Sequence, residues 1–138
     1  MKLDFAFLAD AATVQDNGMF AVVGGGFDVV RGEQFPATKY AMALIGRVRF
    51  EPGECGKQYR ILAEIVAPDG RVIPPELGIS FSQPSHPRDP DRSNTTTFCF
   101  NYQGVRFPAP GDYSFRLSDG VSVIGQVVLE VVPTGDHS

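Results

Sequence analysis

Two alternating segments joined by a tight turn near the C-terminal end constrain the fold of this chain more than any other feature. The apolar members of these segments are Tyr113, Phe115 and Leu117, followed by Val127, Leu129 and Val131. Asp119-Gly120 lies between the segments, and polar residues fill the alternate positions. A period of two is that of a β-strand, and a Gly-containing turn between two such runs is typical of a β-hairpin. We therefore expect both sets of apolar side chains to face one buried layer.

The same alternation recurs upstream, which extends the prediction to the whole chain. Segments near residues 40–50, 59–65 and 95–102 each place apolar residues on one face, the first with Tyr40, Met42, Leu44, Val48 and Phe50. Fifteen Gly and eleven Pro supply the turns between short strands. We predict an all-β fold, a two-sheet antiparallel sandwich of eight to ten short strands, immunoglobulin-like or C2-like. An open β-barrel is the alternative.

Breaks in the pattern suggest where the sheets begin and end. Residues 1–132 are expected to form a single β-sandwich domain, with a frayed C-terminal tail at 133–138. Gly24-Gly25-Gly26 predicts a bend or bulge, and Pro74-Pro75 predicts a sheet edge because proline cannot donate to a ladder. The Ala-rich piece Leu8–Val14 is long enough for one helical turn but too short to stand as a helix.

An ordered set of short motifs runs through nearly the whole chain. It consists of Leu8-Ala9-Asp10-Ala11-Ala12, Asn17-Gly18, Val22-Val23-Gly24-Gly25-Gly26, Phe35-Pro36, Asp69-Gly70, Asn101 and Phe107-Pro108-Ala109-Pro110-Gly111-Asp112-Tyr113. With this set the chain resembles a family of small, mostly bacterial β-sandwich proteins known as a domain of unknown function. The resemblance implies a β-sandwich, and it implies no catalytic or binding residues.

Charge and hydropathy exclude several classes of partner. The net charge of −4 argues against nucleic acid, because phosphate neutralisation needs a basic face. Uncharged stretches fall short of the roughly 20 residues that span a bilayer, so no membrane partner is expected. Asp4 and Asp10 interrupt the early apolar residues, and we expect a cytoplasmic protein. In that compartment Cys55 and Cys99 are expected as free thiols, with a disulfide as the alternative.

The titratable residues do not suggest an enzyme. A nucleophilic Ser or Cys needs a base, and the two histidines are His86 in a loop and His137 in the terminal tail. Asp89 and Asp91 offer oxygen ligands for a cation such as calcium, but Arg88 and Arg92 flank them and weaken such a site. We therefore expect no catalytic residues, no metal and no other cofactor.

Two groups of residues are candidates for partner contacts. Ser82–Ser93 is the longest irregular stretch, and we predict a contact loop there with His86, Arg88, Asp89, Asp91 and Arg92. Arg47, Arg49 and Arg60 alternate with apolar residues and are predicted to form a basic face on the solvent side of a sheet.

These features favour a non-enzymatic interaction or structural module that binds a protein partner through loops or an exposed sheet edge. If the apolar run Val121–Val132 is an edge strand, self-association as a symmetric homodimer would close it. The alternative is a small-molecule or carbohydrate binder at one loop end. Exposed tyrosine rings would favour that binder, and buried rings would favour the interaction module.

Overall fold

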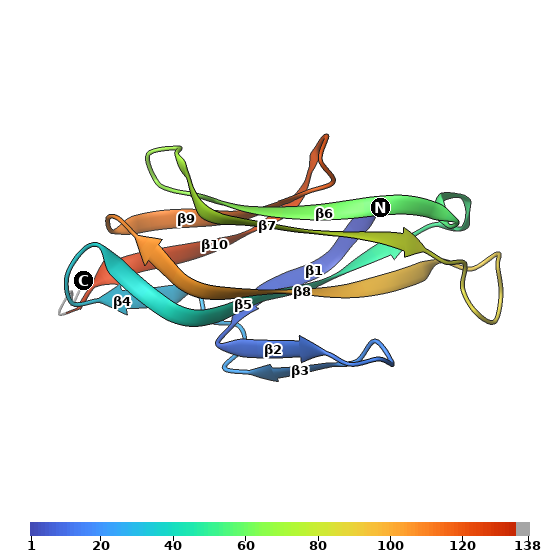
Figure 1. The fold of residues 1–138 in the computed structure, drawn as a ribbon, viewed down its shortest axis with the longest axis horizontal. Coiled ribbons are helices and arrows are strands. Elements are labelled where there is room, and N and C mark those ends of the chain that lie inside the picture. Colours follow the sequence, from blue (N-terminus) through green and yellow to red (C-terminus); the bar gives the residue numbers. More distant parts are fainter. Residues whose placement is uncertain (135–138) are drawn as a thin grey trace.

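The computed structural model describes residues 1–134, and over this range the chain is built almost entirely of β-strands (Figure 1). The strands are β1 (Lys2–Ala9), β2 (Ala11–Val14), β3 (Phe20–Val23), β4 (Val29–Gly32), β5 (Ala37–Phe50), β6 (Lys57–Val66), β7 (Val72–Gln83), β8 (Asn94–Phe107), β9 (Gly111–Ser118) and β10 (Val123–Pro133). A short 3-10 turn, Pro52–Glu54, is the one helical element in that range. It is far too short to cross a membrane, so these residues contain no membrane-spanning helix. The predicted all-β class is confirmed.

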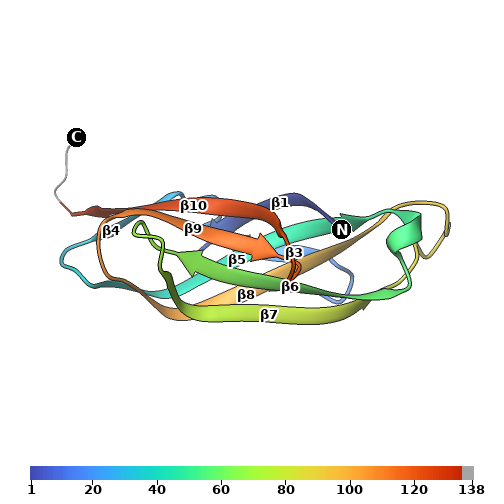
Figure 2. The ribbon, with the colours of Figure 1, turned by 90° about the horizontal axis from the view of Figure 1, so that it is seen from above.

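Two sheets face each other and enclose the main core. A three-stranded sheet has the order β1-β5-β8, and a five-stranded sheet has the order β4-β10-β9-β6-β7 (Figures 1 and 2). The predicted hairpin is confirmed as β9 and β10, in which Phe115 lies opposite Val127 and Tyr113 opposite Leu129. The predicted inward face of β9 is fully buried in this core. We call this core the inter-sheet layer.

The two sheets approach each other along both seams of the sandwich. In both views β1 runs beside β10 and β7 beside β8 (Figures 1 and 2). At the first seam the Leu3 side chain lies so close to Gly125 that a Cβ on that glycine would meet it. At the second seam the Thr96 hydroxyl donates to the buried Gln83 side chain. These side-chain contacts join the two sheets along edges where no backbone hydrogen bonds of the described residues connect them.

A two-stranded ribbon, β2 and β3, forms a second, thinner layer on the outer face of the three-stranded sheet (Figure 1). Ala12 of the ribbon and Ala43 and Ile45 of β5 are buried between the ribbon and the sheet, and Phe7, Val22 and Cys99 pack around them. We call this the ribbon layer. Leu8–Val14 forms no helical turn, because Asp10 bends the chain between β1 and β2 and its N–H donates to the Val23 carbonyl at 3.0 Å. The glycines after β3 form the expected bend, with φ of 63° at Gly24.

The face assigned to Tyr40 is also wrong. Met42 and Leu44 are buried as predicted, whereas the Tyr40 side chain is 81% exposed. In the paired strand β8, Tyr102, Val105 and Phe107 are all buried. Tyr102 and Val105 are an odd number of positions apart, so the alternation of inward side chains shifts by one residue between these two. Gly104, with φ of 75°, lies at this shift and adopts a conformation that most side chains disfavour. The inward positions of β5 therefore move to Ala37 and Lys39, and Tyr40 faces solvent.

The sheet edges differ from the expectation in one respect. Pro74-Pro75 lies in β7, which is an edge strand as predicted. In contrast, β10 is an inner strand, because β4 pairs with it in parallel on the side away from β9. The β4 ladder covers only residues 130–133 of β10, and the rest of this strand, on which the homodimer expectation rested, is paired with β9 alone among the described residues. Pro133 belongs to β10, and Thr134 N–H donates to the Gly32 carbonyl at 2.8 Å, while residues 135–138 of the expected tail lie outside the described residues.

Candidate functional site

The predicted contact loop is shaped by its own backbone. It begins after Gln83, where β7 ends, and leads into β8 at Asn94. The His86 Nδ1 accepts from the Arg88 N–H at 3.1 Å, and the Asp89 carboxylate accepts from the Asp91 N–H at 2.9 Å. Arg88, Asp91 and Arg92 are exposed, so the loop presents separate charges to solvent. Within residues 1–134, no three His, Cys, Asp or Glu side chains come together in a way that could hold a metal ion.

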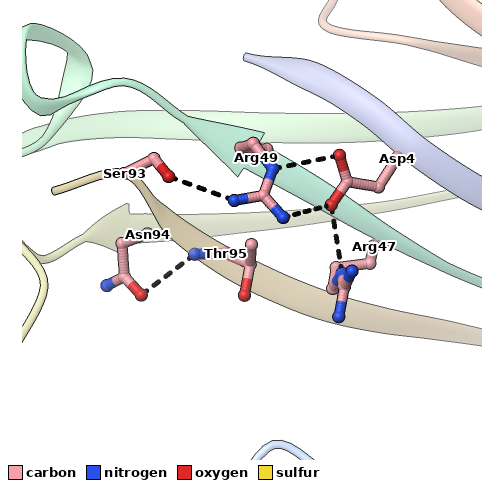
Figure 3. A network of polar contacts seen from close by, with 6 residues as sticks. All are labelled: Asp4, Arg47, Arg49, Ser93, Asn94 and Thr95. Atoms are coloured by element: carbon pink, nitrogen blue, oxygen red, sulfur yellow. Dashed lines mark hydrogen bonds and ion pairs between the residues drawn. The ribbon is translucent and has the colours of Figure 1, made fainter.

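Arg47 and Arg49 do share the outer face of β5, but an aspartate lies between them (Figure 3). Asp4 of β1 accepts from Arg49 Nε at 3.2 Å and from Arg49 Nη2 at 3.0 Å, and it also accepts from Arg47 Nε at 3.1 Å. These hydrogen bonds, the one from Arg49 first, lower the pKa of the Asp4 carboxyl. Arg49 Nη1 donates to the Ser93 hydroxyl at 3.0 Å. The face is thus a network in which one carboxylate is shared by two guanidinium groups, rather than an open basic stripe.

Arg60 does not join this face. The turn at Pro52–Glu54 carries the chain from β5 into β6, which belongs to the opposite sheet. There Arg60 is exposed and packs beside Gly120. The predicted three-arginine face is therefore wrong in composition, because consecutive long strands fall in different sheets.

The structure reveals a site that the sequence reasoning missed, a groove between β4 and the first residues of β5. Two adjoining hollows of about 660 Å³ and 370 Å³ make up this groove, and they share Val30, Arg31, Thr38 and Tyr40. We call it the β4–β5 groove. The exposed Tyr40 ring borders both hollows, so it is a free aromatic surface at the centre of the site.

One end of the groove is ordered by a lysine. Lys39 Nζ lies 3.1 Å from the Asp10 carboxylate and 5.1 Å above the centre of the Phe27 ring. The ion pair and the cation–π contact hold Lys39 against the bend that follows β3. Arg31 at the other side is exposed and has no ion pair within residues 1–134. Arg31 is therefore a positive charge that no ion pair in this range engages, and the Glu33 carboxylate also lines the second hollow.

The backbone of β4 is open along the groove. Asp28 and Gly32 direct their carbonyls to β10, where Glu130 N–H and Thr134 N–H donate to them, both at 2.8 Å. Because the backbone groups of successive residues in a strand point to opposite sides, those of Val29 and Arg31 point away from β10. No strand in the described part of the chain pairs with that side of β4. An unpaired row of N–H and C=O groups is a template for another strand.

The tyrosines divide between core and surface. Tyr102 and Tyr113 are 1% exposed, and the Tyr59 hydroxyl donates to the Glu54 carbonyl at 2.7 Å from a half-buried position. Tyr40 alone among the four presents its ring to solvent. No signal in its own strand marks this exposure, because Tyr40 continues the alternation of Met42 and Leu44. The shift at Gly104 that turns the ring outward lies on a different strand.

Residues 4–132 match a protein-family model whose description is "Family of unknown function (DUF6941)". No curated protein matches the chain. The match covers every element of the two facing sheets and of the ribbon apart from the ends of β1 and β10.

Proposed function

Since the chain belongs to this family of unknown function, we propose its role from its geometry, as a non-enzymatic interaction module. The module binds an extended segment of a partner protein along the open edge of β4. The observation that carries this proposal is the outward-facing backbone of Val29 and Arg31, which lies in a groove beside the exposed Tyr40 ring.

Strand addition of this kind derives affinity from main-chain hydrogen bonds and specificity from side chains. Val29 and Arg31 occupy the same face of β4, and both are exposed. A partner strand would therefore place an apolar residue opposite Val29 and an acidic residue opposite Arg31, since such cross-strand pairs are favourable. Tyr40 supplies a rigid aromatic anchor of the type enriched in binding hot spots. The expected ligand is thus an extended segment that alternates apolar and acidic residues.

The free thiols of Cys55 and Cys99 support a reducing compartment such as the cytoplasm for this interaction. Self-association is the competing use of the same edge, because two copies of β4 can pair with each other. A protein partner that supplies an acidic residue is favoured over a second copy because, within β4 itself, a symmetric pair would place Arg31 opposite Arg31 or Val29.

The test is selection of peptides from a random displayed library on the full chain, followed by calorimetry. We expect enriched peptides with alternating apolar and acidic residues. Tyr40→Ala should weaken their binding about tenfold or more. Arg31→Pro should abolish binding, because it removes an outward N–H while the β10 ladder uses the groups of its neighbours. The matched Arg31→Ala variant keeps that N–H and should lose affinity only in part.

Two results would overturn the proposal. One is peptide binding that is unchanged in both Tyr40→Ala and Arg31→Pro, with each variant shown to be folded by its amide spectrum. The other is a dimer of the free chain by sedimentation that Arg31→Pro converts to a monomer. That second result would assign the edge to a second copy instead.

A further inference from the structure

A separate polar cleft lies between the turn of the ribbon and the outer face of the three-stranded sheet. Its volume is about 490 Å³. The ribbon contributes Gln15, Asp16, Asn17 and Gly18, and the sheet contributes Arg47 with residues 94–97 of β8. We call it the ribbon cleft. It shares no residue with the β4–β5 groove, so it is independent of the proposed function.

Arg47 is held in a fixed orientation at the floor of this cleft. Its Nε donates to Asp4, and its guanidinium carbon lies 5.1 Å above the centre of the Phe5 ring. Only Nε contacts Asp4 (Figure 3), and within residues 1–134 the terminal nitrogens make no hydrogen bond or ion pair. Arg49, by contrast, uses Nε and both terminal nitrogens on Asp4 and Ser93. One carboxylate thus serves two guanidinium groups, and the uncompensated charge lies on the open fork of Arg47.

Neutral hydrogen-bonding groups surround this fork. Thr97 lies directly opposite Arg47 in the β5–β8 ladder, and Thr95 lies opposite Arg49, so both threonines share the face of the arginines. Their hydroxyls have no hydrogen-bond partner in the described residues, whereas the Thr96 hydroxyl on the other face donates to Gln83. On the ribbon side, the Asn17 oxygen accepts from the Met19 N–H at 3.0 Å, which leaves its amide N–H groups available to the cleft. The cleft is rich in donors.

We propose that the ribbon cleft binds a small hydrophilic carboxylate. A guanidinium fork matches a carboxylate in two parallel hydrogen bonds, and such charge-assisted pairs are the strong ones. Of the described residues that line the cleft, Arg47 is the one cation and Asp16 the one anion, so a monoanion, which meets less repulsion from Asp16, is favoured over a phosphate dianion. The Asp16 carboxylate can only accept hydrogen bonds, so we expect the rest of the ligand to carry hydroxyl groups that donate to it. Val14 is the one aliphatic side chain that lines the cleft, which fits a polar molecule of the size of a sugar acid.

The test is a titration of the isotope-labelled full chain with D-glucuronate, followed through its amide spectrum. Saturable shifts are expected at residues 15–18, 47 and 94–97, and D-glucose, which has no carboxylate, should give none. Arg47→Gln should weaken binding about tenfold or more, because it removes a charge-assisted pair. The matched control is Arg60→Gln on the opposite sheet, which should bind as the parent chain does.

Three outcomes would overturn this site. Binding that survives Arg47→Gln, equal shifts from glucose, or the absence of saturable shifts at these residues would each do so. Glucose 6-phosphate that binds more tightly than glucuronate would reassign the cleft to phosphate and reject the carboxylate. If Arg47→Gln disturbs the fold, the test passes to Thr97→Val. This variant replaces only the hydroxyl, and its affinity for glucuronate must be lower than that of the parent chain. Peptide binding at the β4–β5 groove should be unchanged in both variants, so the two sites fail or succeed separately.

Discussion

The inter-sheet layer and the ribbon layer are built from different residues, although both are sheet faces covered by strands. Large side chains that are fully buried fill the first, among them Phe50, Phe98, Phe107, Phe115 and Tyr113. Between the ribbon and the sheet the buried residues are Ala12, Ala43 and Ile45, while Phe20 is 37% exposed. Since hydrophobic stabilisation scales with apolar area removed from water, the inter-sheet layer supplies most of the stability.

This difference predicts which part of the molecule unfolds locally. Regions with few buried apolar contacts unfold locally at lower free energy than the core. The ribbon is such a region, and it forms one wall of the ribbon cleft. We therefore expect the ribbon to separate from the sheet without loss of the sandwich, and three measurements test this comparison.

The largest effect is expected in the inter-sheet layer. Phe115→Ala removes a fully buried ring that lies 5.6 Å from Tyr102, centre to centre, and it should destabilise the protein by about 3–5 kcal/mol. Urea unfolding gives this free energy, with Tyr40→Ala as the exposed aromatic control. A loss below about 1 kcal/mol, the range of a surface change, would show that this layer does not dominate stability.

A smaller effect is expected beneath the ribbon. Val22→Ala removes two methyl groups from a half-buried side chain and should cost about 1 kcal/mol. Amide hydrogen exchange should show this loss at Asp10, whose N–H donates to Val23, more than at amides of β9. Equal acceleration at both places would mean that ribbon and sandwich unfold together.

The smallest effect concerns the ion pairs at the rim of the ribbon layer. Arg47 lies between Asp4 and the Phe5 ring. The Phe5 ring in turn lies 6.0 Å from the Phe20 ring of the ribbon, centre to centre. The pKa of Asp4 is lowered in the folded state, so its stabilisation is present above the unfolded pKa and is lost as pH falls through the folded value. Asp4→Asn should therefore be less stable than the parent at neutral pH and equal to it in acid. A constant difference in unfolding free energy between pH about 7 and about 3 would contradict this assignment.

The parts of the fold that depend on neighbouring residues could be predicted from the sequence. The β9–β10 hairpin follows from alternation and a short turn, and the edge position of β7 follows from Pro74-Pro75. Arg47 and Arg49 were placed on a solvent face by the same alternation. Their pairing with Asp4 was hidden, because Asp4 lies where β1 departs from regular register between Leu3 and Phe5.

The rest depends on contacts between distant segments. Tyr40 was assigned to the core because nothing in its own strand reports the shift at Gly104 in β8. Arg60 was grouped with Arg47 because sequence spacing does not reveal which sheet a strand joins. The β4–β5 groove exists because four residues of β4 pair in parallel with β10, and a strand of that length carries too little pattern to predict its partner.

The parallel pairing of β4 with β10 also has a consequence for folding kinetics. The whole stretch from β5 to β9 separates these strands in the sequence, so a very long loop must close before their ladder can form. Topologies dominated by such non-local pairings fold slowly, and β4 gains its one neighbour only when the last strand arrives. In a refolding experiment followed residue by residue, protection of the β4 ladder should therefore appear after that of the β9–β10 hairpin.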